Sequence, residues 1–98
     1  MSKAHIHVNR NLPLAAQSDK GHNRWHPDIA PTLRISSGTQ VEIQTLDAMD
    51  GQVRPGMKSA ELLGANPRLV HPLTGPVYIE GAEPGDLLAI EIDTIASR

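Results

Sequence analysis

Cysteine is absent from the 98-residue sequence and aromatic side chains nearly so, with no Phe, one Trp and one Tyr. The lack of cysteine excludes disulfide bonds, thiolate-ligated zinc and a cysteine nucleophile in this chain. The lack of aromatic residues leaves Val, Ile, Leu, Ala and Met to build the core, and these bury less area per side chain. We therefore expect a thin aliphatic core and limited stability without a partner surface.

Clustered basic residues and long apolar runs are also missing. Lys and Arg are scattered and the formal net charge is −2, whereas a nucleic-acid-binding surface needs a basic cluster. No apolar run approaches the roughly 18 residues that a membrane-spanning helix requires. The first residues, MSKAHIHVNRNL, lack the apolar stretch of a secretory signal. The sequence predicts a cytoplasmic protein with neither nucleic acid nor membrane as a partner.

Short stretches of alternating apolar and polar residues, separated by turns, indicate a mainly β fold. This pattern predicts four strands, at residues 4–8, 39–46, 77–80 and 87–95. In the last of them Leu88, Ile90 and Ile92 share one face. Ser59 to Leu63 is expected to form one or two helical turns. Eight Gly and eight Pro fit one sandwich-like or barrel-like domain, residues 1–98, with at most one short helix.

Residues 9–35 contain several Pro and Gly residues but no sustained period, and are predicted to form one long ordered loop. Within it, the stretch GHNRWHPDI places His22 and His26 on either side of the lone Trp25. On the residues alone, three roles stay open: binding a metal, gripping a substrate, or packing the loop. No Glu completes an HExxH zinc motif here.

Acidic residues follow two of the predicted strands. Asp47 and Asp50 come after the second strand, where carboxylates are held by the sheet yet reach solvent and can bind a hard cation or activate water. The alternative is a turn in which Asp bonds its own backbone. Glu80 is expected to share a face with Tyr78, and residues 83–86 to form a turn.

Three segments, HNRWHPDI, DAMDGQ and VHPLTGPVYIEGAEPGD, in this order, resemble the acetamidase/formamidase family, and its formamidase branch most closely. The resemblance extends from about His5 to Ile95. It implies hydrolysis of formamide or a short aliphatic amide to the carboxylate and ammonia. It further implies a β-rich homo-oligomer with a bound divalent metal, zinc by preference, that activates water.

The resemblance also implies roles for individual residues. The candidate catalytic residues are Asp47, His26 and Glu80, the candidate metal ligand is Asp47, and the candidate substrate-binding residues are His22 and Trp25. Family members are several-fold longer, so we expect an N-terminal portion whose C-terminal remainder is a second chain or a missing segment. The alternative is a non-catalytic β module, or a truncated remnant, that only associates with a larger subunit.

Overall fold

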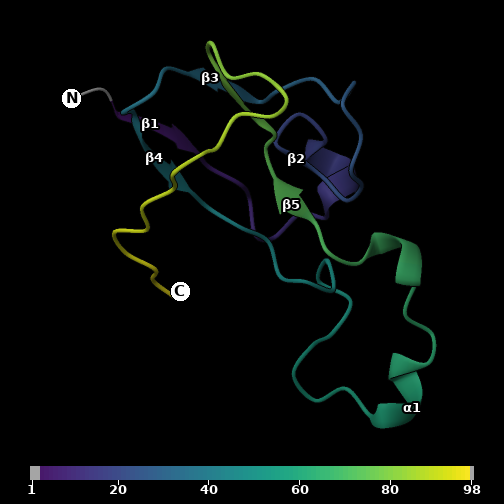
Figure 1. Ribbon diagram of the computed structural model, residues 1–98. Helices are drawn as coiled ribbons and strands as arrows, with labels where there is room; N and C mark the ends of the chain where they lie inside the picture. The colour runs from purple at the N-terminus through teal and green to yellow at the C-terminus, as the bar shows by residue number, and fades with distance from the viewer. Residues whose placement is uncertain (1–2, 98) are drawn as a thin grey trace.

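The computed structural model describes residues 3–97, which form three small two-stranded sheets (Figure 1). Each sheet joins segments that are distant in the sequence: β1 (Lys3–Ile6) runs parallel to β4 (Gln40–Ile43), β2 (Gly21–His22) antiparallel to β5 (Leu73–Thr74), and β3 (Leu33–Ile35) parallel to β6 (Val77–Ile79). The helical elements of these residues are α1 (Ser59–Leu62) and two 3₁₀-helices, η1 (Leu14–Gln17) and η2 (Pro67–Leu69). The prediction of a mainly β chain with one short α-helix is confirmed.

The core is as thin as the composition predicts. Among the described residues, Ile6 is the one buried hydrophobic side chain of the core, at 2% exposure. It alternates with exposed His5 and His7, whose rings stack on one face with their centroids 4.4 Å apart. Ile43, which pairs with Ile6 in the parallel ladder, remains 45% exposed.

A buried glutamine organises the chain between β1 and β2. The Gln17 amide nitrogen donates to the carbonyls of Asn9 and Leu12, at 2.8 and 3.1 Å, and its oxygen accepts from the Asn9 N–H at 2.9 Å. Beyond it, β2 approaches β5 so closely that a Cβ on Gly21 would lie 2.5 Å from the Leu73 carbonyl oxygen. The close approach leaves no room for a side chain at this point.

The prediction of one loop over residues 9–35 is wrong, because η1, β2 and β3 lie within it. Strands of two or three residues are too short to show a period of their own. They become strands because β5 and β6, more than forty residues further along the chain, offer partners for them.

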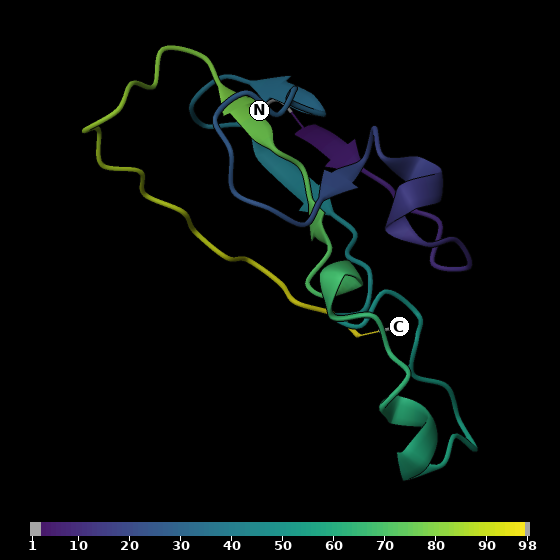
Figure 2. The ribbon, with the colours of Figure 1, turned by 90° about the vertical axis from the view of Figure 1, so that its right-hand side faces the viewer.

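The predicted strand at 87–95 is wrong as well. Residues 83–86 form the expected turn, with the Asp86 N–H donating to the Glu83 carbonyl at 3.0 Å. From there the chain runs extended but is not assigned to any strand, and it lies apart from the three sheets over most of its length (Figure 2). An extended segment becomes a strand only when a neighbour completes the hydrogen-bond ladder, and none does so within residues 3–97.

The molecule is open in shape. Its radius of gyration is 15.7 Å, against about 13 Å for a compact domain of this length. Its accessible surface is 8055 Å², against roughly 5,500 Å² for a compact monomer of this mass. In the described part of the chain, the helices are all too short and too polar to cross a bilayer.

Candidate functional site

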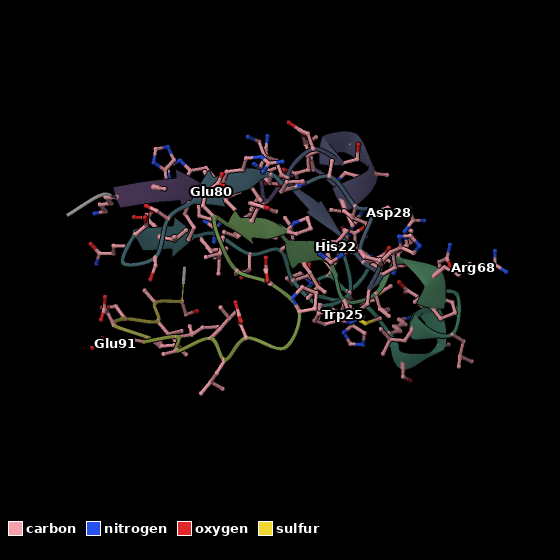
Figure 3. All side chains as sticks on the ribbon, turned by 45° about the horizontal axis from the view of Figure 1, so that its top comes forward. His22, Trp25, Asp28, Arg68, Glu80 and Glu91 are labelled. Atoms are coloured by element: carbon pink, nitrogen blue, oxygen red, sulfur yellow. The ribbon has the colours of Figure 1, made fainter. Side chains whose placement is uncertain are left out.

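We call residues 22–28 the Trp25 loop; it begins where β2 ends (Figure 3). His22 Nδ1 lies 2.5 Å from the carbonyl oxygen of Arg24. A carbonyl oxygen only accepts hydrogen bonds, so Nδ1 carries the proton. In the neutral ring, Nε2 then keeps its lone pair and can accept a proton or a hydrogen bond.

His26 has the opposite arrangement. Its Nδ1 accepts the backbone N–H of Asp28 at 3.1 Å, which requires Nδ1 to be unprotonated and places the proton of the neutral ring on Nε2. The Asp28 carboxylate lies 3.9 Å from the same Nδ1. A fully protonated ring would therefore face this carboxylate in place of the backbone N–H. The two imidazoles of the loop present one acceptor and one donor.

Trp25 lies between these histidines with 89% of its surface exposed. The loop is fastened from its other side, where the Asn23 amide donates to the Arg68 carbonyl at 2.6 Å. The indole is therefore held out by an anchored loop and fills no gap within the described part of the chain. Packing among the described residues therefore does not account for the indole.

We call residues 47–51 the Asp47 turn. One carboxylate oxygen of Asp47 accepts the Met49 N–H at 2.8 Å, and the other accepts the Gly51 N–H at 2.7 Å. Asp50, which has a φ of 55°, accepts the Leu14 N–H at 2.9 Å and so ties the turn to η1. Both carboxylates thus hold backbone in place, and that of Asp47 does so within its own turn, as expected for an Asp that forms a turn.

Glu80 follows β6, and its backbone N–H donates to the Ile35 carbonyl at 2.8 Å. Its carboxylate lies 4.0 Å from the Arg34 guanidinium, which also lies over the Tyr78 ring at 4.3 Å. Tyr78 and Glu80 therefore share a face, as the alternation predicts. The ion pair is more than half exposed on both sides, and such pairs contribute about 0–1 kcal/mol at most.

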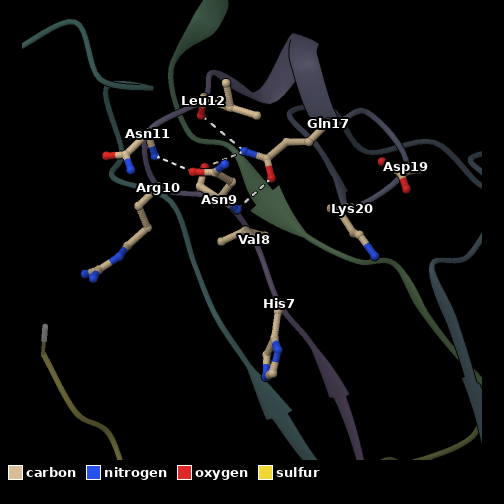
Figure 4. A pocket seen from close by; sticks show the side chains of 9 residues that line it. All are labelled: His7, Val8, Asn9, Arg10, Asn11, Leu12, Gln17, Asp19 and Lys20. Carbon is tan, nitrogen blue, oxygen red and sulfur yellow. Dashed lines mark hydrogen bonds between the residues drawn. The ribbon is translucent and has the colours of Figure 1, made fainter.

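The structure leaves the predicted site residues in three separate places. Glu80 is well apart from His22 and Trp25 (Figure 3), and the Asp47 turn shares no recorded side-chain contact with either. Within residues 3–97, no three metal-binding side chains gather. A cleft of about 710 Å³ opens elsewhere, beside η1, and its lining contains none of the predicted residues (Figure 4).

Sequence reasoning missed the groups that orient the two imidazoles. The N–H of Asp28 sets the tautomer of His26, and the carbonyl of Arg24 sets that of His22. Both partners are backbone groups two residues further along the chain, so the residue types at these positions do not reveal them. Nothing in the sequence indicated that the Arg68 carbonyl accepts from Asn23, because 45 residues separate the two.

Comparison with known sequences decides the family. Residues 7–98 match the Acetamidase/Formamidase family. The chain belongs to the acetamidase/formamidase family. An acetamidase of Mycolicibacterium smegmatis is 35% identical over 85 residues, which are 87% of this chain and 21% of the relative. A formamidase of Methylophilus methylotrophus is 34% identical over 76 residues, 78% of this chain and 19% of the relative. These identities do not favour the formamidase branch over the acetamidase branch.

A solved structure agrees with the family match. The gamma lactamase from Delftia acidovorans superposes with a TM-score of 0.76 at 31% identity, and the match covers 86% of this chain and 20% of that one. The chain thus spans about one fifth of the length of the acetamidase/formamidase proteins that it matches. It is a partial piece of the family's sequence.

Proposed function

We propose that this chain is one piece of an amide hydrolase that converts formamide or a short aliphatic amide to the carboxylate and ammonia. The observation that carries the proposal is the Trp25 loop. Its two histidines present opposite ring tautomers around an exposed indole, in a chain that belongs to the acetamidase/formamidase family.

Amide hydrolysis requires an activated water, stabilisation of the developing oxyanion, and a proton for the leaving nitrogen. His22 is suited to binding, because its Nε2 lone pair accepts an N–H of the substrate amide. His26 is suited to the proton transfer. It would deliver a proton from Nε2, and the Asp28 carboxylate lies 3.9 Å from Nδ1 on the other side of the ring.

Trp25 would form one wall of the substrate pocket. An indole that is 89% exposed in this chain offers an apolar surface that the rest of the protein closes over. A closed pocket of this kind excludes larger acyl groups, and the discrimination amounts to roughly 1–3 kcal/mol per methylene.

The divalent metal, the roles of Asp47 and Glu80, and a homo-oligomer belong to the same proposal. The described residues do not fit a complete metal site, since no three ligands gather and both Asp47 oxygens accept backbone N–H groups. If zinc activates the water, the rest of the protein would supply most of its ligands, and Asp47 would contribute one through a remaining lone pair. Glu80, whose carboxylate lies 4.0 Å from the Arg34 guanidinium, would act as base or as part of the site wall.

A second candidate substrate is a cyclic amide. The superposable structure is that of a gamma lactamase, and opening a lactam cleaves the same carbonyl–nitrogen bond. The two candidates differ in the product, because a lactam yields an amino acid and a linear primary amide yields ammonia.

The test is a chimera in which this chain replaces the matching fifth of the M. smegmatis acetamidase. Hydrolysis of formamide, acetamide, propionamide and 2-pyrrolidinone is measured, together with metal content before and after chelation. We expect turnover of the linear amides that His26→Ala abolishes. A folded chimera that hydrolyses none of the four, or that is indifferent to His26→Ala, contradicts the proposal and leaves the non-catalytic β module.

A further inference from the structure

The segment 87–95 is an extended chain without a neighbouring strand among the described residues. Every residue from 83 to 97 is exposed, including Leu87 at 97% and Ile90 at 80%. Within residues 3–97 no backbone–backbone hydrogen bond is recorded for residues 87–95, and the one recorded side-chain bond is from the Gln40 amide to Asp93 at 3.3 Å. Its backbone groups are therefore available for pairing.

The side chains of this segment are ordered as in a half-buried strand. Leu88, Ile90 and Ile92 fall on one face, and all three are more than half exposed. Glu91 and Asp93 lie in the middle of the other face, with Leu87 and Ile95 at its two ends. Residues that alternate in this way bury one face and leave the other in water.

Two observations indicate what covers the apolar face. The chain exposes 8055 Å², roughly 2,500 Å² more than a compact monomer of its mass, which is in the range of a permanent subunit interface. The same fold also forms one fifth of the larger gamma lactamase chain. The excess exposed surface, and the four fifths of its relatives' length that this chain does not span, point to the same partner.

A second copy of this chain is a poorer occupant. Antiparallel pairing of two copies along all of 87–95 places Glu91 directly opposite Glu91, and parallel in-register pairing opposes each acid to itself. Like charges directly opposite one another destabilise a sheet.

We propose that residues 87–95 form a β-strand that pairs with the remaining four fifths of an acetamidase/formamidase polypeptide, with Leu88, Ile90 and Ile92 packed on that partner. The proposal rests on the proposed function only in taking its partner from the same family. The pairing itself does not depend on which amide is hydrolysed.

The test uses the complete chain and two probes: the M. smegmatis acetamidase and the M. methylotrophus formamidase, each lacking the region that matches this chain. Hydrogen exchange is followed residue by residue. We expect amides 87–95 to exchange rapidly in the chain alone. With a probe bound, we expect about 100-fold or greater protection, at alternate residues for pairing on one side and throughout for pairing on both.

Three variants separate strand pairing from loose apolar adhesion. Ile90→Asp puts a charge on the apolar face and should weaken binding roughly 30-fold or more, as for a central interface residue. Ala89→Asp adds the same charge to the opposite face and should bind nearly normally. Glu91→Pro removes a backbone donor and should also weaken binding. All three positions are exposed, so the melting temperature of the chain alone should not change.

The outcomes are distinct. Failure of both probes to bind, or binding with amides 87–95 still exchanging rapidly, overturns the proposal. So does equal protection in a dimer of this chain without a probe, measured by sedimentation. Protection in a complex that hydrolyses no amide supports the pairing and contradicts the proposed function. Hydrolysis in a complex that leaves 87–95 unprotected does the reverse.

Discussion

The Asp47 turn and the Trp25 loop use their polar groups in different ways. In the turn, both carboxylate oxygens of Asp47 are engaged by backbone N–H groups of the same turn. In the loop, each imidazole uses Nδ1 for a local hydrogen bond, and no partner of Nε2 is recorded within the described residues. The polar groups of the Asp47 turn are used within the turn, whereas the Trp25 loop presents an exposed indole and two Nε2 atoms for which the described residues show no partner.

The largest expected effect is on the loop side of this comparison. In the chimera, His26→Ala should lower kcat by about 100- to 10,000-fold, the usual contribution of general acid–base catalysis. Stability should not change, because the side chain is 56% exposed. His7→Ala, equally exposed at 55% and outside the loop, is the matched control. Amide kinetics and a melting curve check both variants, and equal rates would place His26 outside the chemistry.

On the turn side, the expected effect is on stability. Asp47→Asn replaces the oxygen that accepts the Gly51 N–H with an amide nitrogen, which leaves that donor without its partner. The bond is exposed, so we expect a loss of roughly 0.5–1.5 kcal/mol in the free energy of unfolding, measured by urea titration. If Asp47 also binds a metal, Asp47→Asn should lower the activity and the metal content even of the folded chimera. Unchanged unfolding would contradict the role given to the turn.

A smaller effect is expected for Trp25→Ala, and it concerns selectivity. The preference of the chimera for formamide over acetamide and propionamide should shrink by roughly tenfold, the contribution of one methylene in an apolar pocket. Leu63→Ala is the control, since Leu63 is also 89% exposed. If neither variant changes the preference among the amides, Trp25 does not form part of the pocket wall.

The smallest effect is expected for Asp50→Asn. Asn tolerates the left-handed backbone at this position, φ 55°, and its side-chain oxygen still accepts the Leu14 N–H. The free energy of unfolding should change by less than about 0.5 kcal/mol. A loss as large as that of Asp47→Asn would show that the charge, and not the acceptor, holds the turn against η1.

How far the sequence predicts this structure depends on how local each signal is. Turn residues act on their immediate neighbours, and the helix at Ser59–Leu62 and the turn at 83–86 form where expected. β2 and β3 depend on partners far along the chain, which no local pattern reveals. Residues 87–95 show the converse, a clear strand pattern without the partner that would make it a strand.

The candidate site follows the same rule. The three motifs carry the family, which the comparison confirms. The protons on His22 and His26 depend on backbone atoms of Arg24 and Asp28, so residue types alone do not indicate them. The side chains that would complete a pocket around Trp25 are absent from this stretch of sequence, and no reading of it could have provided them.

The close approach of β2 to β5 at Gly21 has a consequence for how this protein varies. A Cβ there would lie 2.5 Å from the Leu73 carbonyl oxygen and 3.1 Å from the Leu14 side chain, and every amino acid except glycine carries a Cβ. The exclusion at Gly21 comes from lack of space and not from backbone conformation, because six other glycines of the chain have a positive φ and Gly21 does not. A substitution would push the strand away from its partner and carry the neighbouring His22 with it. Exposed positions such as 89 can accept other residues. In a randomised library selected for folding, position 21 should be occupied by glycine.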